Sequence, residues 1–162
     1  MNAGTAHITT MSPYFVRTSF SMWHAGYALG EAAAKNLHAK TAVVGYTDFP
    51  PGKDSLNAFK RAFEASGGKV VDEIPMGGAG AVPDMTPFFQ RAKDKKPDVF
   101  FVFVPAGDHA TAVVKTYGAL GMRAAAKTGS AAVAASLPGI ARQTFSRARG
   151  PWTATIARSS RG

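Results

Sequence analysis

Three short runs of β-branched and apolar residues, separated by segments with helical periodicity, constrain the fold of this chain more than any other feature. The runs are TAVVGY at 41–46, KVVDEI at 69–74 and DVFFVFV at 98–104. They are more continuous than strands with one face in water, and are typical of parallel strands buried on both faces. A further strand is predicted over 15–20, ahead of the first run.

Helical patterns lie between these runs. Leu56, Phe59 and Phe63 recur at i, i+3 and i+7, which places an apolar stripe on one helix face. That helix is expected to end at the pair of glycines at 67–68, and to be capped at its start by Asp54 or Ser55. Upstream, Ser21 is a suitable cap for a helix over 22–37.

Two more helices are predicted towards the C-terminal side. One contains Phe88, Phe89 and Ala92 and stops before Pro97, because the residue before a proline is disfavoured in the helical region. The other is expected to end just before Gly121. Its apolar positions are Ala110, Val113, Val114, Tyr117 and Leu120.

Alternating strands and helices predict an α/β fold. Right-handed crossovers then give a doubly wound parallel sheet with helices on both faces. Ligands of such sheets bind beyond the carboxyl ends of the strands. The segments expected to line a site are therefore 19–23, 47–53 and 105–109.

Charge is divided unevenly along the chain. All ten acidic residues lie between Glu31 and Asp108, whereas 124–162 contains Lys127 and five arginines and no acid. The net charge of +9 is therefore mostly a property of this C-terminal part. Its Ala/Ser/Gly/Arg-rich composition, without periodicity, predicts an irregular basic tail, and no specific nucleic-acid partner is expected. A basic nucleic-acid-associated protein is kept as an alternative, because such a tail can bind polyanions without sequence preference.

Composition also limits the classes of site. The chain has no cysteine, which excludes a disulfide framework, a cysteine-ligated metal and a thiol nucleophile. Residues 1–10 have neither a basic n-region nor a long apolar h-region, so no secretory signal is expected and the chain as written would stay where it is made. No apolar run reaches the length of a membrane span.

No motif predicts catalysis. The stretch GKDS at 52–55 lacks the first glycine of a phosphate loop and has Asp54 in place of the hydroxyl residue. The four histidines lack metal-binding spacings, and no serine lies in a GxSxG elbow. No catalytic residue, metal or cofactor is therefore predicted. A small flavodoxin-like or nucleotide-binding α/β enzyme is kept as an alternative.

The motifs SPYFVRTSFS, TAVVGYTDFPPGKDSLNAFKRAFEASGGKVV and AKDKKPDVFFVFVPAGDHATAVVKTYGALGM occur in this order between residues 12 and 122. As a series they resemble the periplasmic solute-binding proteins of Leu/Ile/Val-binding type, the receptors of ABC importers. The resemblance implies two doubly wound lobes that enclose a small solute, a periplasmic location and an ABC permease as partner. It predicts a first-lobe or hinge remnant at 1–11, a second lobe at 12–123 and the tail at 124–162.

The resemblance also implies site residues. Ala3 and Thr5 match the first-lobe segment that holds a ligand carboxylate, and Phe49 lies where many members have a tyrosine. Pro105 lies where an aromatic residue often follows a strand. The expected ligand contacts are completed by Phe20, Trp23, Ala106 and Gly107.

Most of these side chains are apolar or aromatic, and Phe49 lacks the hydroxyl of a tyrosine. A pocket of this kind favours a solute with an aromatic or aliphatic body and an acid group over a small polar amino acid. Packing of a helix on the sheet is the alternative interpretation of Phe20 and Trp23. Members of the family continue with a further strand and an acidic ligand residue, where this chain turns into its acid-free tail. A fragment with impaired binding, shifted in frame near residue 124, is therefore expected.

Overall fold

The computed structural model describes residues 4–80, 82–122 and 132–136, the last range by its backbone alone. A short 3-10 helix, His7–Thr10, precedes the main body. The elements of the body are, in chain order, α1 (Met22–Lys35), β1 (Thr41–Tyr46), α2 (Pro50–Ala65), β2 (Lys69–Pro75), α3 (Thr86–Asp94), β3 (Val99–Phe103), α4 (Asp108–Ala119) and β4 (Ala132–Ser136).

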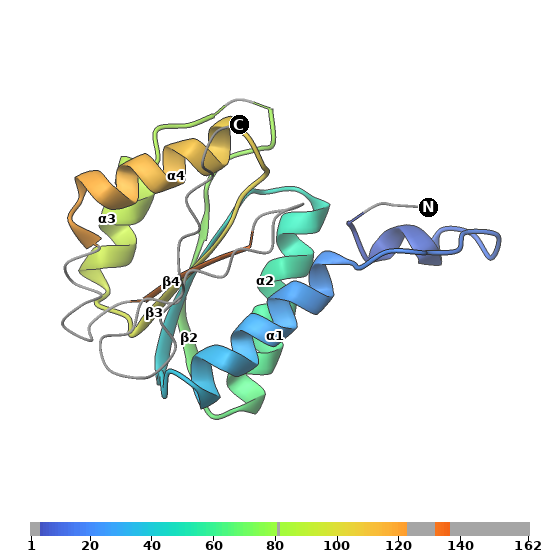
Figure 1. Cartoon of the computed structure of the whole chain (residues 1–162), viewed down its shortest axis with the longest axis horizontal. Coiled ribbons are helices and arrows are strands. Elements are labelled where there is room, and N and C mark those ends of the chain that lie inside the picture. Colours follow the sequence, from blue (N-terminus) through green and yellow to red (C-terminus); the bar gives the residue numbers. More distant parts are fainter. Residues whose placement is uncertain (1–3, 81, 123–131, 137–162) are drawn as a thin grey trace, which may run out of the picture.

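The four strands form one parallel sheet in the order β2-β1-β3-β4. Helices α1 and α2 cover one face of it, and α3 and α4 cover the other (Figure 1). This confirms the predicted doubly wound α/β architecture. The three predicted strands in 41–104 form within one residue of the expected limits. β1 and β3 are buried on both faces, as expected. β2 is an edge strand in which only Ile74 is fully buried, so the expected burial on both faces is wrong for this run.

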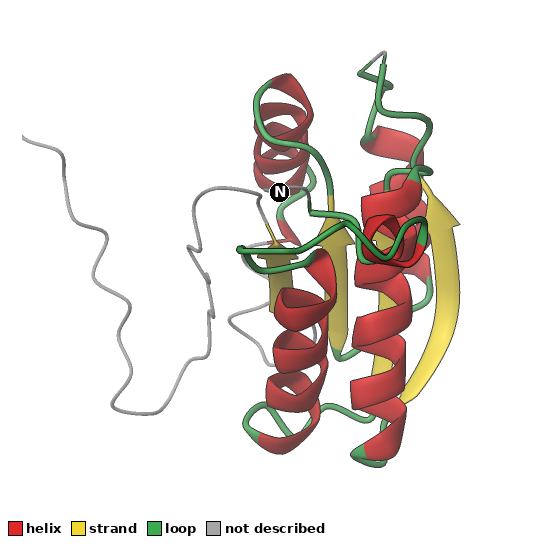
Figure 2. Ribbon diagram, turned by 90° about the vertical axis from the view of Figure 1, so that its right-hand side faces the viewer, coloured by secondary structure: helices red, strands yellow, loops and turns green. Residues whose placement is uncertain are grey.

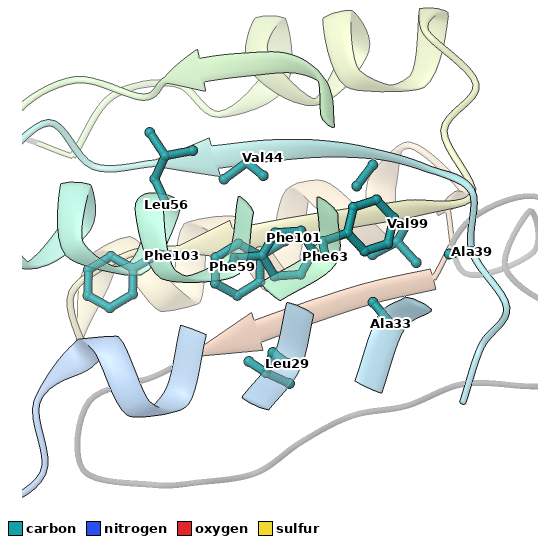
Figure 3. Close-up of a cluster of buried hydrophobic side chains, with 11 residues drawn as sticks. Leu29, Ala33, Ala39, Val44, Leu56, Phe59, Phe63, Val99, Phe101 and Phe103 are labelled. Carbon is teal, nitrogen blue, oxygen red and sulfur yellow. The ribbon is translucent and has the colours of Figure 1, made fainter. Parts of the chain in front are cut away.

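The side chains of β1 and β3 alternate between two cores. Val44, Phe101 and Phe103 point to the α1 and α2 side, where Figure 3 shows them with Phe59 and Phe63. Val43, Phe100 and Val102 point to the α3 and α4 side. Every residue from Phe100 to Val104 is fully buried, as predicted for a strand covered on both faces.

Helices α1 and α2 pack very closely. A Cβ atom on Gly26 would lie 2.8 Å from the carbonyl oxygen of Ser55, and one on Gly30 would lie 2.4 Å from that of Phe59. Both distances are shorter than any ordinary contact, so the two glycines permit this backbone approach.

The predicted strand over 15–20 is wrong. This stretch has no regular secondary structure, and Phe15, Val16 and Phe20 are exposed. A strand needs a hydrogen-bonded neighbour, and within the described part of the chain no strand pairs with this stretch. β propensity alone therefore does not make it a strand.

The predicted cap of α2 is also wrong. The helix begins at Pro50, with Phe49 as its N-cap residue, so Asp54 and Ser55 lie inside it. Proline fits the first helical positions because its fixed φ matches the helix and its missing N–H would be unsatisfied there. The prolines at 50 and 51 therefore set the start of the helix. Asp54 is instead used in a tertiary contact described below.

Helices α3 and α4 end where they were predicted to end, but the residues that they bury agree only partly with the prediction. Helix α3 ends before Pro97, and Gly121 adopts a positive φ of 64° just beyond α4. Val113 is buried, but Val114 is 63% exposed. Val114 therefore does not belong to the buried stripe that was predicted for this helix.

The C-terminal part departs from the prediction in one place. Ala132–Ser136 forms β4 and pairs in parallel with Val99–Phe103 of β3, although an irregular course was expected there. Pairing with an exposed strand edge uses backbone groups and needs no acidic residue or hydrophobic pattern, so composition did not reveal it. Residues 124–131 and 137–162 of the predicted tail lie outside the described residues. The boundary after residue 123 stays a prediction.

Every described helix is too short or too polar to cross a lipid bilayer.

Candidate functional site

The carboxyl ends of β1 and β3 define the site suggested by the topology. The chain leaves β1 to form β2 on one side, while β3 pairs with the other side of β1. This reversal of direction is a switch point, where open α/β sheets bind their ligands. Three segments lie near it: the turn after β1, the turn after β3, and the N-terminal segment together with the start of α1.

The turn after β1 is tied to its neighbours by backbone hydrogen bonds. The Thr47 N–H donates to the Phe103 carbonyl of β3 at 3.0 Å. The Asp48 N–H donates to the Gly77 carbonyl at 2.8 Å, which links this turn to the loop after β2. The main chain is thus fixed on both sides of the switch point.

Phe49 and Gly52 fit this turn closely. The Phe49 ring packs on the core beside Phe103, with ring centroids 6.1 Å apart. A Cβ atom on Gly52 would lie 1.9 Å from the Thr47 carbonyl oxygen. Gly52 therefore allows the first turn of α2 to fold back onto the end of β1, which explains a glycine there without a bound phosphate.

The turn after β3 is short and open. Pro105 is half-buried, whereas Ala106 and Gly107 are exposed. Gly107 has a φ of 90°, in the region that favours glycine, and lies directly before α4. Its carbonyl oxygen accepts hydrogen bonds from the N–H and the hydroxyl of Thr111, at 3.0 and 3.1 Å.

Two buried polar atoms near these turns lack a protein partner. Thr47 is fully buried and its Oγ1 makes no hydrogen bond, and His109, in the first turn of α4, is 5% exposed with an unpaired Nε2. Buried polar atoms are nearly always paired, with protein or with bound molecules. Each of them is therefore a candidate partner for water or ligand.

The N-terminal segment contacts the starts of α1 and α2. The Gly4 carbonyl accepts a hydrogen bond from the Met22 N–H at 2.8 Å. The Thr5 hydroxyl and the Ala6 N–H both donate to Asp54 Oδ2, at 3.1 and 2.6 Å. Thr5 thus lies beside the second turn of α2, and its hydroxyl is engaged by a carboxylate of the protein itself. Ala3 lies outside the described residues.

The two aromatic residues near the start of α1 differ in exposure. Phe20 is 80% exposed and makes an edge-to-face contact with His24, at 5.7 Å between ring centroids. Packing of Phe20 on the sheet is therefore wrong. Trp23 is half-buried. Figures 1 and 2 show that the preceding segment projects from the side of the molecule on which α1 and α2 lie.

One ion pair borders the turn after β1. Lys53 Nζ lies 3.0 Å from Asp48 Oδ1. The hydrogen bond to Asp48 and the charge of this carboxylate raise the pKa of Lys53 above its ordinary value. Lys53 is exposed, as predicted, and stays charged. Among the described residues, no three His, Asp or Glu side chains gather in a way that could hold a metal ion.

The model of the periplasmic binding protein family matches residues 2–155 of the chain. The chain belongs to this family. The predicted resemblance is thereby confirmed, and the family match also extends beyond residue 123. The switch-point edge described above belongs to a lobe of a periplasmic binding protein.

Curated relatives support this assignment. The chain is 41% identical over 118 residues to the Leu/Ile/Val-binding protein homolog 6 of Brucella melitensis, and equally so to that of Brucella abortus. The match covers 72% of this chain and 29% of each relative. The chain thus spans less than a third of the length of these relatives.

Solved structures give the same result. A solute-binding protein of an ABC transporter from Rhodopseudomonas palustris BisB5, in complex with 3,4-dihydroxybenzoic acid, is 41% identical with a TM-score of 0.68. Another from R. palustris, in complex with 4-hydroxybenzoate, is 38% identical with a TM-score of 0.72. These matches cover 82% and 83% of this chain, and 34% and 35% of the neighbours.

Sequence reasoning did not find every polar group at this edge of the periplasmic binding protein lobe. The hydrogen bonds that Asp54 accepts, and the burial of Thr47 and His109, depend on the tertiary structure. For Asp54 the position beside a helix start favoured a cap, and the N-terminal donors that it contacts lie 48 and 49 residues away in sequence. No local pattern predicts such a contact.

Proposed function

We propose that the protein to which this lobe belongs is the solute-binding component of an ABC-type importer, and that its solute is a small aromatic carboxylic acid. The observation that carries the proposal is a pair of donors that hold a carboxylate, the Thr5 hydroxyl and the Ala6 N–H on Asp54. Phe20 and Trp23 near the start of α1, and Phe49 at the start of α2, are the aromatic residues proposed to complete the site.

The ligands of several similar solved structures support this class of solute. Three neighbours from R. palustris, 36–41% identical to this chain, are complexes with hydroxylated benzoic acids. A fourth, 27% identical, is a complex with benzoate. A leucine complex is only 20% identical, so its likeness concerns the fold alone. An aliphatic acid of the branched-chain amino acid class is therefore the second choice.

The proposed roles follow from chemistry. Ala3 and Thr5 would hold the solute's carboxylate through backbone and hydroxyl donors. Phe20, Trp23 and Phe49 would flank the ring, and the loop of Pro105, Ala106 and Gly107 would close one side. Aromatic pairs and apolar burial favour a planar ring at such a position, and a carboxylate accepts strong hydrogen bonds from fixed donors.

Binding rather than covalent chemistry is the proposed activity. A solute that contacts both lobes stabilises the closed form by its differential affinity, and the closed form is presented to a permease. The periplasm is the proposed location, and an ABC permease the proposed partner.

A chimera tests the proposal. Residues 12–122 of this chain would replace the matching segment of the R. palustris protein that is 41% identical, and binding of 3,4-dihydroxybenzoate, 4-hydroxybenzoate and leucine would be measured by calorimetry. We expect the chimera to bind an aromatic acid in preference to leucine. The unaltered R. palustris protein is the control. A folded chimera that binds leucine and no aromatic acid would contradict the proposed solute class.

A further inference from the structure

The Asp54 carboxylate is held in the manner of a bound anion. Its Oδ2 atom accepts two hydrogen bonds, from the Thr5 hydroxyl at 3.1 Å and from the Ala6 N–H at 2.6 Å. Both donors come from a segment nearly fifty residues away in sequence, and both bonds are partly buried. Hydrogen bonds to an ionised acceptor are about twice as strong as neutral ones. The pair of donors is therefore a carboxylate-binding arrangement in this structure.

The donors are fixed by contacts other than those to Asp54. The Gly4 carbonyl is bound by the Met22 N–H at 2.8 Å, and the Thr5 carbonyl is bound by the Arg17 guanidinium. The peptide groups on both sides of the Thr5 side chain are thus held in place. Preorganised donors lose little freedom when a ligand replaces the carboxylate they hold, so they favour exchange of one carboxylate for another.

The place of this contact is also significant. Asp54 is in the second turn of α2, which is the helix that follows β1. The donors lie next to the start of α1. Ser55, its neighbour, has a buried Oγ without a hydrogen-bond partner. The contact is therefore at the edge of the sheet where a solute is expected, rather than on a remote surface.

From this geometry we infer that Asp54 is an internal competitor for the solute's carboxylate: it occupies the Thr5 and Ala6 donors when no solute is present and has to leave them when a solute binds. This inference rests on the proposed function. Asp54 would then lower the affinity of the site for carboxylic acids, because a solute gains the two hydrogen bonds only by displacing two that exist already.

The test follows the Ala6 amide in the 162-residue chain by NMR, with acetate as a probe for the donors alone and 4-hydroxybenzoate as a probe for the solute class. In the unaltered protein we expect a protected Ala6 amide that responds to acetate only weakly. In Asp54→Ala we expect faster exchange of this amide and acetate binding about tenfold tighter, because no internal carboxylate competes.

Two further variants serve as controls. Glu64→Gln removes one negative charge from the far end of the same helix and should leave the Ala6 amide and the acetate response unchanged. Thr5→Val combined with Asp54→Ala should remove most of the gain in acetate affinity, because one of the two donors is gone. Unchanged amide signals from β1 and β3 show in each case that the variant is folded.

The outcomes separate this inference from the proposed function. Equal exchange of Ala6 in the unaltered protein and Asp54→Ala, or equal affinity of both for acetate, overturns the inference. Absence of any acetate response in Asp54→Ala also overturns it, and leaves the solute class to the chimera. If Asp54→Ala binds acetate more tightly but the chimera binds leucine and no aromatic acid, the inference holds and the proposed aromatic solute fails.

Discussion

At the scale of single residues, the distance to the nearest backbone atom decides what an added methyl group costs. Gly30→Ala would place a Cβ atom 2.4 Å from the Phe59 carbonyl oxygen, so helices α1 and α2 would have to move apart. We expect a loss of about 1–3 kcal/mol in the free energy of unfolding, measured by urea titration.

Gly118→Ala is the matched control for this prediction. Gly118 lies in α4, and nothing is within 4 Å of its ideal Cβ position. Alanine is preferred to glycine in a helix, so this variant should gain up to about 1 kcal/mol. A loss at Gly118 as large as at Gly30 would mean that the close approach of α1 and α2 is not the cause of the loss at Gly30.

Aromatic residues of the chain differ in burial, and we expect their truncation to differ in cost accordingly. Phe101 is fully buried and stacks on Phe59, with ring centroids 4.4 Å apart, and Phe103 is also fully buried. Truncating either to alanine should cost about 3–5 kcal/mol. Phe20→Ala, at a residue that is 80% exposed, should change stability by less than about 0.5 kcal/mol. Thermal melting would check the series, and an unchanged midpoint for Phe103→Ala would contradict its place in the core.

At the scale of elements, Asp98 joins the starts of β1 and β3 at the edge of the sheet opposite the site. Its Oδ2 accepts hydrogen bonds from the Lys40 N–H, the Thr41 N–H and the Thr41 hydroxyl, at 2.9, 2.9 and 3.0 Å. Burial alone would raise the pKa of Asp98. The hydrogen bonds from Lys40 and Thr41 outweigh burial, so this pKa lies below its ordinary value in the folded protein.

A depressed carboxyl pKa makes stability depend on pH in a defined direction. The contribution of Asp98 is complete above the unfolded pKa of about 3.9 and is lost as the pH falls through the folded pKa. Asp98→Ala should therefore cost about 1–3 kcal/mol at pH 7 and less as the pH falls below about 4. Urea titrations at pH 7 and at a pH below about 4 check this. Asp94→Ala, on the exposed face of α3, is the control and should show little effect at either pH.

The sequence predicted β1 and β3 well because their burial is continuous, and it predicted poorly where a neighbouring strand decides whether a strand forms. DVFFVFV predicts β3 because two helical layers require an apolar residue at every position. The stretch 15–20 has similar residues but no strand beside it in the described structure, so its β propensity has no effect. β4 was not predicted from composition because its residues carry little strand signal of their own. It forms because the edge of β3 supplies a hydrogen-bonded neighbour.

The same distinction applies to the site. Topology alone correctly predicted that the turns after β1 and β3 would lie at one edge, because parallel strands all end on the same side. It could not predict that Asp54 would accept hydrogen bonds from Thr5 and Ala6, since that contact joins segments 48 and 49 residues apart. The ligand contacts named from the resemblance stay predictions.

At the scale of the whole molecule, β4 lies beyond the predicted boundary of the lobe at residue 123. It pairs with all five residues of β3, whose backbone groups would otherwise form an open edge. A chain ending at residue 123 should therefore melt several degrees below one ending at residue 136, since each kcal/mol is worth roughly 4–8 °C in a domain of this order of size. Equal melting temperatures would mean that the lobe does not depend on this strand.

The size of the chain relative to its family leads to the last prediction. The chain spans 29% of the length of its curated relatives. The receptor that we propose has two lobes and would gain affinity by enclosing a solute between two surfaces. A single lobe leaves much of the solute in water, where hydrogen bonds to protein replace bonds to solvent with little net gain. It also has to meet the full cost of immobilising the solute from fewer contacts.

We therefore expect the isolated 162-residue chain to bind 4-hydroxybenzoate, benzoate and leucine weakly, with dissociation constants of about a millimolar or above. Calorimetric titration of the monomeric chain is the direct measurement, with the R. palustris 4-hydroxybenzoate-binding neighbour as the positive control. Asp54→Ala should tighten the binding of the acids but should not reach the affinity of the R. palustris control, because the substitution supplies no second surface. Micromolar binding by the unaltered chain would contradict the expectation, and would mean that Phe20, Trp23, Phe49 and the turn after β3 form a complete pocket without another lobe.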